Sequence, residues 1–149
     1  MNNTRPLVAK EEIASYIPQK PPVVMIDTLD FCEGAVTKTS FEIKEDTIFV
    51  CDGLFREPGI VENIAQTAAV KAGYEARKLG KDPQLGFIGA IKNLTIHRLP
   101  HVHEVLETSI EIINEVMEVT IIKGTSSISG KPVAECEMKI FIQKGENGQ

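Results

Sequence analysis

Cysteine is scarce in this sequence, and its spacing argues against a fold held together by disulfides or metal. The three cysteines, Cys32, Cys51 and Cys136, are far apart and odd in number, and no two of them form a C-x-x-C pair. Disulfide frameworks and zinc modules carry their cysteines in paired, closely spaced sets. The first 17 residues also lack the apolar run of a signal peptide. We therefore expect free thiols in a cytoplasmic protein.

Excess basic charge and long apolar runs are lacking too. Sixteen Lys and Arg residues against 21 Asp and Glu residues give a formal net charge of −5. A general nucleic-acid binder needs a basic face, so no nucleic-acid partner is expected, although a local basic patch could contact an acidic protein. No apolar run approaches the roughly 20 residues of a membrane span. We expect no cofactor and no metal site either.

The length predicts one domain. The chain has 149 residues, and we expect a single domain over residues 1–149. A domain of this length buries roughly 68–70% of its unfolded surface and can fold on a hydrophobic core alone. Its last residues, KGENGQ, carry no structural signal, so we expect a disordered tail at about 144–149.

The N-terminal third predicts a short helix and then a β-hairpin. Residues 10–17 have the pattern of a helix that ends at a proline. Two consecutive prolines then impose extended backbone, and the apolar residues 23–26 suit a strand. A second strand is expected over residues 35–43, after a turn at Glu33-Gly34.

Residues 59–79 carry the long helical pattern of the sequence. At about 100° per residue, six small or apolar side chains fall in one arc: Val61, Ala65, Ala68, Ala69, Ala72 and Ala76. Because alanine lets other backbone come close, we expect the helix that carries this alanine stripe to be wrapped by other structure and not laid on a surface. Ile60 and Ile64 lie to one side of the stripe, and Gly80 is placed to cap the C-terminus of the helix.

The rest of the chain predicts an antiparallel sheet. Strands are expected over residues 86–98, 104–112, 115–124 and 132–143, because apolar and polar side chains alternate along most of them. In the third of these strands we expect Met117, Val119 and Ile121 to point inward. Hairpin turns are expected at Asn114-Glu115 and at Ser129-Gly130.

This order of elements predicts an α+β domain in which a large antiparallel sheet curls around the long central helix. Such a sheet covers one side of the helix and leaves the other side to a partner. We therefore expect a dimer.

Two stretches carry a more specific pattern. The first is YIPQKPPVVMIDTL (16–29), with I-P and a later proline ahead of an apolar run and I-D; the second is PGIVENIAQTAA (58–69), with E-x-x-A-Q shortly after Pro-Gly. In this element order, over about residues 10 to 143, the chain resembles the 3-hydroxyacyl-acyl-carrier-protein dehydratases of the FabA/FabZ type, which have the hotdog fold. Gln19 stands where that family usually has histidine.

The segment ahead of the helix departs from that family. The family usually has G-H-F-P there, and its histidine is the partner base, whereas CDGLFREPG (51–59) is shorter and contains no histidine. Asp52-Gly53 before E-x-x-A-Q is similar to a divergent branch of dehydratase-like hotdog proteins found with aryl polyene and similar pigment pathways. The resemblance therefore implies the fold more firmly than the activity.

The resemblance implies roles for three residues of the helix. Glu62 would be the carboxylate that acts on the hydroxyl group of a 3-hydroxyacyl thioester, and partial burial would raise its pKa toward a useful range. The alternative is a first-turn carboxylate favoured by the helix dipole. The N–H of Gly59 would polarise the thioester carbonyl, or Gly59 simply starts the helix. Gln66 would orient Glu62 or the substrate hydroxyl, or is an ordinary polar residue.

The second catalytic group remains open in the sequence. Asp52 lies near the position of the family's histidine and is either a substitute acid or base, or a turn residue beside Gly53. The three histidines, His97, His101 and His103, cluster elsewhere and are expected to be solvated, because their spacing specifies no metal site.

Substrate and partners follow from the same resemblance. An acyl tunnel is expected along the strand after the helix, with Phe87, Ile88, Gly89, Ala90 and Ile91 as its wall, and Gly89 and Ala90 leaving room. The same residues could equally be plain core. The implied reaction is dehydration to the trans-2-enoyl thioester, on acyl carrier protein or coenzyme A, by a homodimer or by a hetero-oligomer with another hotdog protein. A hotdog thioesterase and a non-catalytic acyl-binding subunit are the alternatives.

Overall fold

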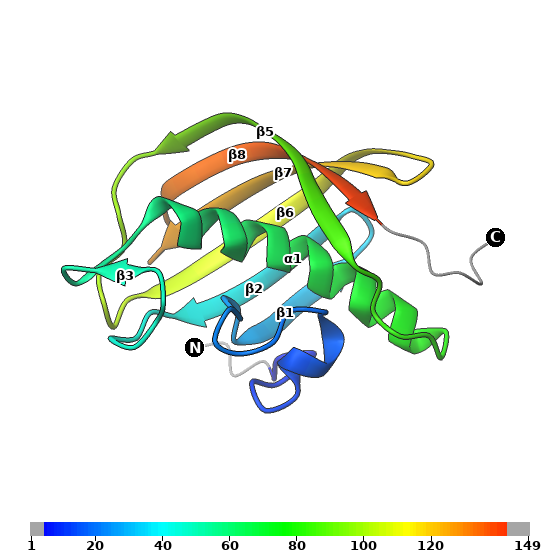
Figure 1. The fold of residues 1–149 in the computed structure, drawn as a ribbon, viewed down its shortest axis with the longest axis horizontal. Helices are drawn as coiled ribbons and strands as arrows, with labels where there is room; N and C mark the ends of the chain where they lie inside the picture. The colour runs from blue at the N-terminus through cyan, green and yellow to red at the C-terminus, as the bar shows by residue number, and fades with distance from the viewer. Residues whose placement is uncertain (1–4, 143–149) are drawn as a thin grey trace.

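The computed structural model describes residues 5–142, so the tail expected at 144–149 lies outside the described residues. The elements in chain order are η1 (Ile13–Tyr16), β1 (Thr28–Glu33), β2 (Val36–Glu42), β3 (Val50–Cys51), β4 (Leu54–Phe55), α1 (Glu57–Lys78), β5 (Gly86–Ile96), β6 (Val105–Val116), β7 (Val119–Ile128) and β8 (Lys131–Ile142) (Figure 1). No helix within these residues is long and apolar enough to cross a membrane.

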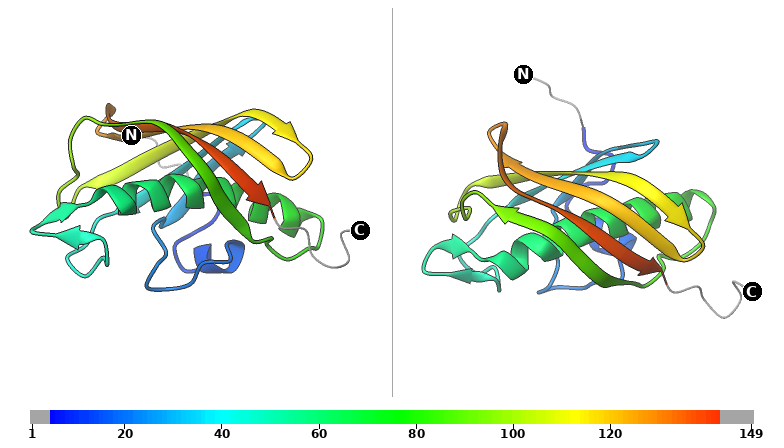
Figure 2. Two further views of the ribbon diagram at one scale, coloured as in Figure 1. Left: turned by 45° about the horizontal axis from the view of Figure 1, so that its top comes forward. Right: turned by 90° about the horizontal axis from the view of Figure 1, so that it is seen from above.

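Within residues 5–142, six strands form one antiparallel sheet in the order β1-β2-β6-β7-β8-β5. The sheet curves around α1, which lies along its concave face, and β5 returns over the end of the sheet beside the helix (Figures 1 and 2). This is the α+β hotdog arrangement that the sequence predicted.

The ends of α1 follow the local chemistry of the sequence. Pro58 lies in the first turn with the acidic Glu57, where a missing N–H and a negative charge are both favourable. At the other end Gly80 has a positive φ of 71°, and the N–H of Lys81 donates to the carbonyl of Ala76 at 2.8 Å. This confirms the predicted C-terminal cap.

The sheet covers the face of α1 that carries Ile60 and Ile64 (Figure 1). Ile60 and Ile64 are fully buried, and a Cβ added at Gly124 on β7 would lie only 2.5 Å from Ile64, so the two backbones approach closely there. The alanine stripe is only half-buried. The sheet wraps the helix as expected (Figure 1), and the isoleucines beside the alanine stripe fill the core, because they bury far more apolar area.

The predicted strand over residues 23–26 was also wrong. These residues are irregular in the structure, and the first strand of the hairpin is β1, which begins at Thr28. Gly34, with φ of 59°, forms the expected turn between β1 and β2. The reason residues 23–26 stay out of the sheet is their bonding to α1, described below.

The turn between β6 and β7 lies three residues later than predicted. Met117 has φ of 56° and is 96% exposed, so Met117-Glu118 and not Asn114-Glu115 forms the turn. The prediction that Met117 and Ile121 point inward was therefore wrong. Ile122 is the fully buried residue of this pair of isoleucines. A shift of odd length moves every side chain to the other face of the sheet. The second predicted turn is confirmed, with positive φ at Ser129 and Gly130.

Candidate active site

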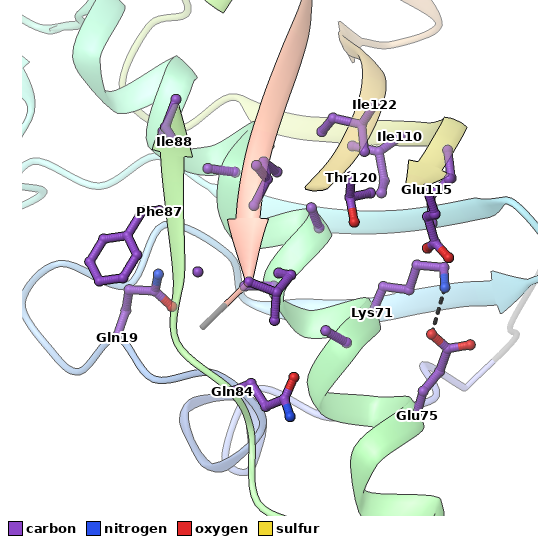
Figure 3. Close-up of a pocket in the computed structure, with 18 of the residues that line it drawn as sticks. Gln19, Lys71, Glu75, Gln84, Phe87, Ile88, Ile110, Glu115, Thr120 and Ile122 are labelled. Carbon is purple, nitrogen blue, oxygen red and sulfur yellow. Dashed lines mark hydrogen bonds and ion pairs between the residues drawn. The ribbon is translucent and has the colours of Figure 1, made fainter. Parts of the chain in front are cut away.

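A cavity of about 390 Å³ lies between α1 and the sheet. The helix contributes one wall through the alanine stripe, and the sheet contributes apolar side chains from four strands, β5 to β8 (Figure 3). The small side chains of the alanine stripe thus leave room for a channel along the helix. Its lining residues include Glu62, Ala65, Ala68, Ala69, Ala72, Ile110, Ile122, Ile140 and Ile142.

Glu62 lies in the wall of this cavity and is half-buried. Gln66, one turn further along α1, donates a hydrogen bond from Nε2 to Oε2 of Glu62 at 2.8 Å. The bond fixes one carboxylate oxygen and leaves the other available to a ligand. Of the two roles expected for Gln66, the structure supports orientation of the carboxylate.

Gln66 is fully buried and makes two more hydrogen bonds, both to segment 18–27. Its Nε2 donates to the carbonyl of Val23 at 2.8 Å, and its Oε1 accepts the N–H of Met25 at 2.6 Å. The backbone of residues 23–26 therefore finds its partners on a helix side chain instead of a strand. Both N–H donors of the Gln66 amide are used, so Gln66 has none left for a substrate.

Asn63 is a second buried tether that the sequence analysis missed. Its Nδ2 donates to the carbonyl of Met25 at 2.7 Å, and its Oδ1 accepts the hydroxyl of Thr108 on β6. Thr108 in turn shares a hydrogen bond of 2.8 Å with Ser126 on β7. The available signal was a polar residue on the apolar side of the helix, directly after Glu62. Asn63 thus links segment 18–27, the helix and the sheet beside the cavity.

Gly59 does not have the free N–H expected of it. Its N–H donates to the carbonyl of Arg56 at 2.9 Å. A Cβ added at Gly59 would overlap the ring of Phe55 and lie 2.8 Å from Cβ of Phe49. Gly59 is therefore needed for close packing where the helix begins, and it does not line the cavity around Glu62.

Asp52 lies in the turn between β3 and β4, with φ of 54°. It lines a different hollow, together with Gly53, Val102 and His103. The structure of the single chain therefore does not bring Asp52 into the cavity of Glu62. Positive φ at Asp52 and Gly53 fits the turn role that the sequence left open.

No histidine lines the Glu62 cavity among the described residues. His101 and His103 are exposed, and the N–H of His101 donates to Glu104, which also forms a two-pronged ion pair with Arg98 at 2.8 and 2.9 Å. Arg98 lowers the pKa of Glu104 to about 2. Within residues 5–142 no cluster of His, Cys, Asp or Glu could hold a metal ion.

The residues expected to form the acyl tunnel divide into two groups. Phe87 and Ile88 line the cavity, whereas Gly89, Ala90 and Ile91 do not. The room expected at Gly89 is filled, because a Cβ there would overlap the ring of Phe141 on the neighbouring strand β8. The cavity is instead lined mainly by the alanines of α1 and the isoleucines of β6, β7 and β8.

The cavity has a charged group far from Glu62. Lys71 is 8% exposed and its Nζ lies 2.5 Å from Oε1 of Glu75. Glu115 of β6 also lines the cavity, on the other side of this ammonium group (Figure 3). Lys71 follows Glu62 by nine positions in the helix, which corresponds to about 14 Å along the axis. The apolar channel therefore has a carboxylate at one end and an ion pair toward the other.

The sequence matches one protein family and is similar to a dehydratase. A family model described as ApeP-like, ApeP dehydratase, matches residues 11–147. The 3-hydroxyacyl-acyl-carrier-protein dehydratase FabZ of Clostridium kluyveri is 28% identical over 138 residues, which cover 89% of this chain and 94% of that protein.

Solved structures show the same fold. The dehydratase heterocomplex ApeI:P from Xenorhabdus doucetiae matches with a TM-score of 0.82 at 14% identity, covering 91% of this chain and 93% of that one. An HP0420 homologue from Helicobacter felis matches with a TM-score of 0.68 at 14% identity, covering 91% and 90%. A hypothetical thioesterase with coenzyme A from Streptococcus pneumoniae matches with a TM-score of 0.62 at 8% identity, covering 77% and 86%.

The family match spans nearly the whole described domain and includes the helix with Glu62 and Gln66. The structural likeness adds the hotdog fold, and the curated relative adds a hydro-lyase. On these grounds the chain is a hotdog-fold dehydratase that belongs to the ApeP-like family.

Proposed function

We propose that this protein dehydrates a 3-hydroxyacyl thioester on acyl carrier protein to the trans-2-enoyl thioester, with Glu62 as the acid–base group. The observation that carries the proposal is the bond between Gln66 and Glu62, which holds a carboxylate in the wall of a largely apolar channel. A channel of this kind suits an acyl chain, and the names of the FabZ and ApeI:P relatives favour this reaction. Fatty acid or polyene-type lipid synthesis is the setting that we infer.

The reaction requires two proton transfers. A base removes a proton from the carbon next to the thioester carbonyl, the bond between C3 and oxygen breaks, and the hydroxyl leaves with a second proton as water. The C2–C3 double bond forms in the same process, so no oxidant or reductant is needed. In this proposal Glu62 acts on the hydroxyl, and the carboxylate oxygen that Gln66 does not bond supports that role.

The second group is expected from another chain. Phe87, Ile88, Ile91 and Leu94 of β5 are 37–53% exposed, and β5 pairs with β8 on one side only within residues 5–142. An apolar strand with a free edge favours pairing with a second hotdog chain. Such a homodimer or hetero-oligomer could bring Asp52 of a second copy, or a group of a different hotdog protein, to the Glu62 cavity.

The free N–H that would let Gly59 polarise the thioester carbonyl is missing. Gly59 could take that role only if its bond to Arg56 broke. We therefore assign the acid–base step to Glu62 and leave the groups that stabilise the enolate to the assembled oligomer.

The test is conversion of 3-hydroxyacyl-acyl carrier protein to the enoyl product by wild-type protein and by Glu62→Gln. We expect Glu62→Gln to lower the rate about 10²- to 10⁴-fold, the usual contribution of a general acid or base. Its stability should stay close to wild type, since an amide oxygen still accepts the bond from Gln66. Wild-type protein that gives no enoyl product with any chain length, carrier or hotdog partner would overturn the proposal. Release of free thiol in the same assay would indicate a thioesterase instead.

A non-catalytic subunit is the second candidate, and two observations favour it. No histidine among residues 5–142 lines the Glu62 cavity, and one similar structure is a heterocomplex of two dehydratase chains. In this case the protein would be inactive alone and active only with a second hotdog chain. If Glu62→Gln within the mixed oligomer kept full activity, the catalytic carboxylate would belong to the partner.

A further inference from the structure

One buried atom of a residue that lines the Glu62 cavity lacks a partner. Among the residues that the structure describes, Oε1 of Gln19 is the buried side-chain nitrogen or oxygen without a hydrogen-bond partner. Gln19 lines the same cavity as Glu62. Buried acceptors in folded proteins are nearly always paired, and an unpaired one calls for an explanation. An unfilled binding role is one such explanation.

Hydrogen bonds hold the chain in place on both sides of Gln19, through the residues that follow it and those that precede it. Lys20 donates from Nζ to the carbonyls of Ala14 and Ile17, at 2.6 and 2.9 Å. On the other side, Val23 and Met25 are tied to α1 by Gln66 and Asn63. The short segment that carries Gln19 is therefore anchored to the same helix as Glu62. Figure 3 shows Gln19 beside Phe87 of β5 at the cavity wall.

The side-chain amides of Gln66 and Gln19 therefore differ in their hydrogen bonding. Gln66 uses both N–H donors and accepts one hydrogen bond, through contacts with Glu62, Val23 and Met25, whereas Oε1 of Gln19 accepts none and is shielded from water. Gln19 as a whole is only half-buried, so rotation of its side-chain amide can present Oε1 to a ligand in this cavity that offers an O–H or N–H donor, whereas Gln66 is held by three hydrogen bonds and is fully buried. Shielding makes such a pairing more favourable than it would be in water.

We propose that Oε1 of Gln19 accepts a hydrogen bond from the 3-hydroxyl group of the substrate. This rests on the proposed function, in which that hydroxyl must leave as water. A hydroxyl that donates its hydrogen to Gln19 presents its lone pairs to another group, and Glu62 in the same cavity is that group. Gln19 thus selects 3-hydroxyacyl chains over chains without the hydroxyl and orients the leaving group.

The first experiment compares Gln19→Met with wild type. Methionine has a similar length but no comparable acceptor. We expect kcat/KM for dehydration to fall about 3- to 10-fold, the effect of one neutral hydrogen bond. The melting temperature should stay the same or rise, because the oxygen that is removed has no partner in the free protein. A structural role would lower both. An unchanged kcat/KM would overturn the proposal.

A second variant provides a rescue. Gln19→His keeps an acceptor nitrogen while the imidazole is neutral, which holds above about pH 6.5. Its kcat/KM should exceed that of Gln19→Met above this pH and fall back toward it below. Equal kcat/KM for the two variants at every pH would contradict a hydrogen-bonding role.

Binding of two unreactive ligands identifies the donor. Both are acyl pantetheine amides, one with a 3-hydroxyl group and one without it, and calorimetry gives their affinities. Gln19→Met should weaken the hydroxylated ligand about 3- to 10-fold and leave the other unchanged. Equal weakening of both would place Gln19 on the pantetheine arm and overturn the proposal. If wild-type protein binds the hydroxylated ligand more tightly but forms no enoyl product, the proposed function fails while the role of Gln19 stands.

Discussion

Gln66 bonds through one amide group to Glu62, to the carbonyl of Val23 and to the N–H of Met25. A single buried side chain therefore orients the proposed catalytic carboxylate and holds segment 18–27 against the helix. The geometry of the site and the local stability therefore depend on the same residue. Substitution of Gln66 should affect both, whereas substitution of Glu62 should affect activity alone.

Gln66→Met should damage stability and activity together. It keeps most of the volume but leaves the N–H of Met25 and the carbonyl of Val23 without their partners. One unsatisfied buried group costs about 1–3 kcal/mol, so the free energy of unfolding should fall by at least about 2 kcal/mol in urea denaturation. Glu62→Gln is the matched control and should lose activity with little loss of stability. Equal stability of Gln66→Met and wild type would show that the tether contributes little.

Gly73→Ala should destabilise the protein, although it lies in the interior of α1. Replacing glycine by alanine in an exposed helix interior normally stabilises by about 1 kcal/mol. Here the added Cβ would overlap the carbonyl oxygen of Tyr16 in η1, and backbone cannot rotate away as a side chain can. We expect a loss of about 1–3 kcal/mol, typical of overpacking, measured by denaturation. A gain in stability would show that η1 moves freely from the helix.

Glu104 should make the loop of His101 and His103 sensitive to acid. Its hydrogen bonds to Arg98 are the main reason that its folded-state pKa is lowered to about 2, while an unfolded glutamate has a pKa of about 4.3. A lowered pKa stabilises the fold above the unfolded value, and this contribution is lost as pH falls from about 4.3 toward 2. Arg98→Met should reduce the loss of stability in that window. Acid titration of the melting temperature of both proteins tests this, and identical curves would contradict it.

Lys71 should influence which acyl chains fit. Lys71→Met removes the buried ammonium and extends the apolar channel beyond the region near Ala68 and Ala72. Because the partner carboxylate of Glu75 is 54% exposed, it can be solvated, and stability should change little. We expect KM to fall for 3-hydroxyacyl chains long enough to reach this end, about 14 Å of helix from Glu62, and to stay unchanged for short ones. A uniform change at all lengths would argue against this placement.

Local patterns were enough to predict much of the fold. The bounds of α1, the cap at Gly80 and the turn at Ser129-Gly130 follow from residue chemistry within a few positions. The alternation along β6 and β8 was also correct, since their buried residues include Leu106, Thr108 and Ile110, and Cys136, Met138 and Ile140. The E-x-x-A-Q pattern located Glu62 and Gln66 one turn apart, where the structure joins them.

Where a pattern had two acceptable positions, the sequence could not choose. In β7 both Ile121 and Ile122 are apolar, so a turn displaced by three residues gave a plausible but inverted face. The close approach of Gly124 to Ile64 shows which face is inward, because only a glycine there leaves room for the helix side chain.

The sequence by itself determined the helix, most of the strands and the carboxylate on the helix, because those features depend on neighbours in the chain. Tertiary structure alone decided that residues 23–26 bond to α1 instead of a strand, since their partners Asn63 and Gln66 lie 38 to 43 residues away. It also decided that every polar atom of the Gln66 amide has a hydrogen-bond partner and that Oε1 of Gln19 has none. A hydrogen bond between distant residues leaves no periodic trace in the sequence, so the groups available to a substrate emerge only when the chain is folded.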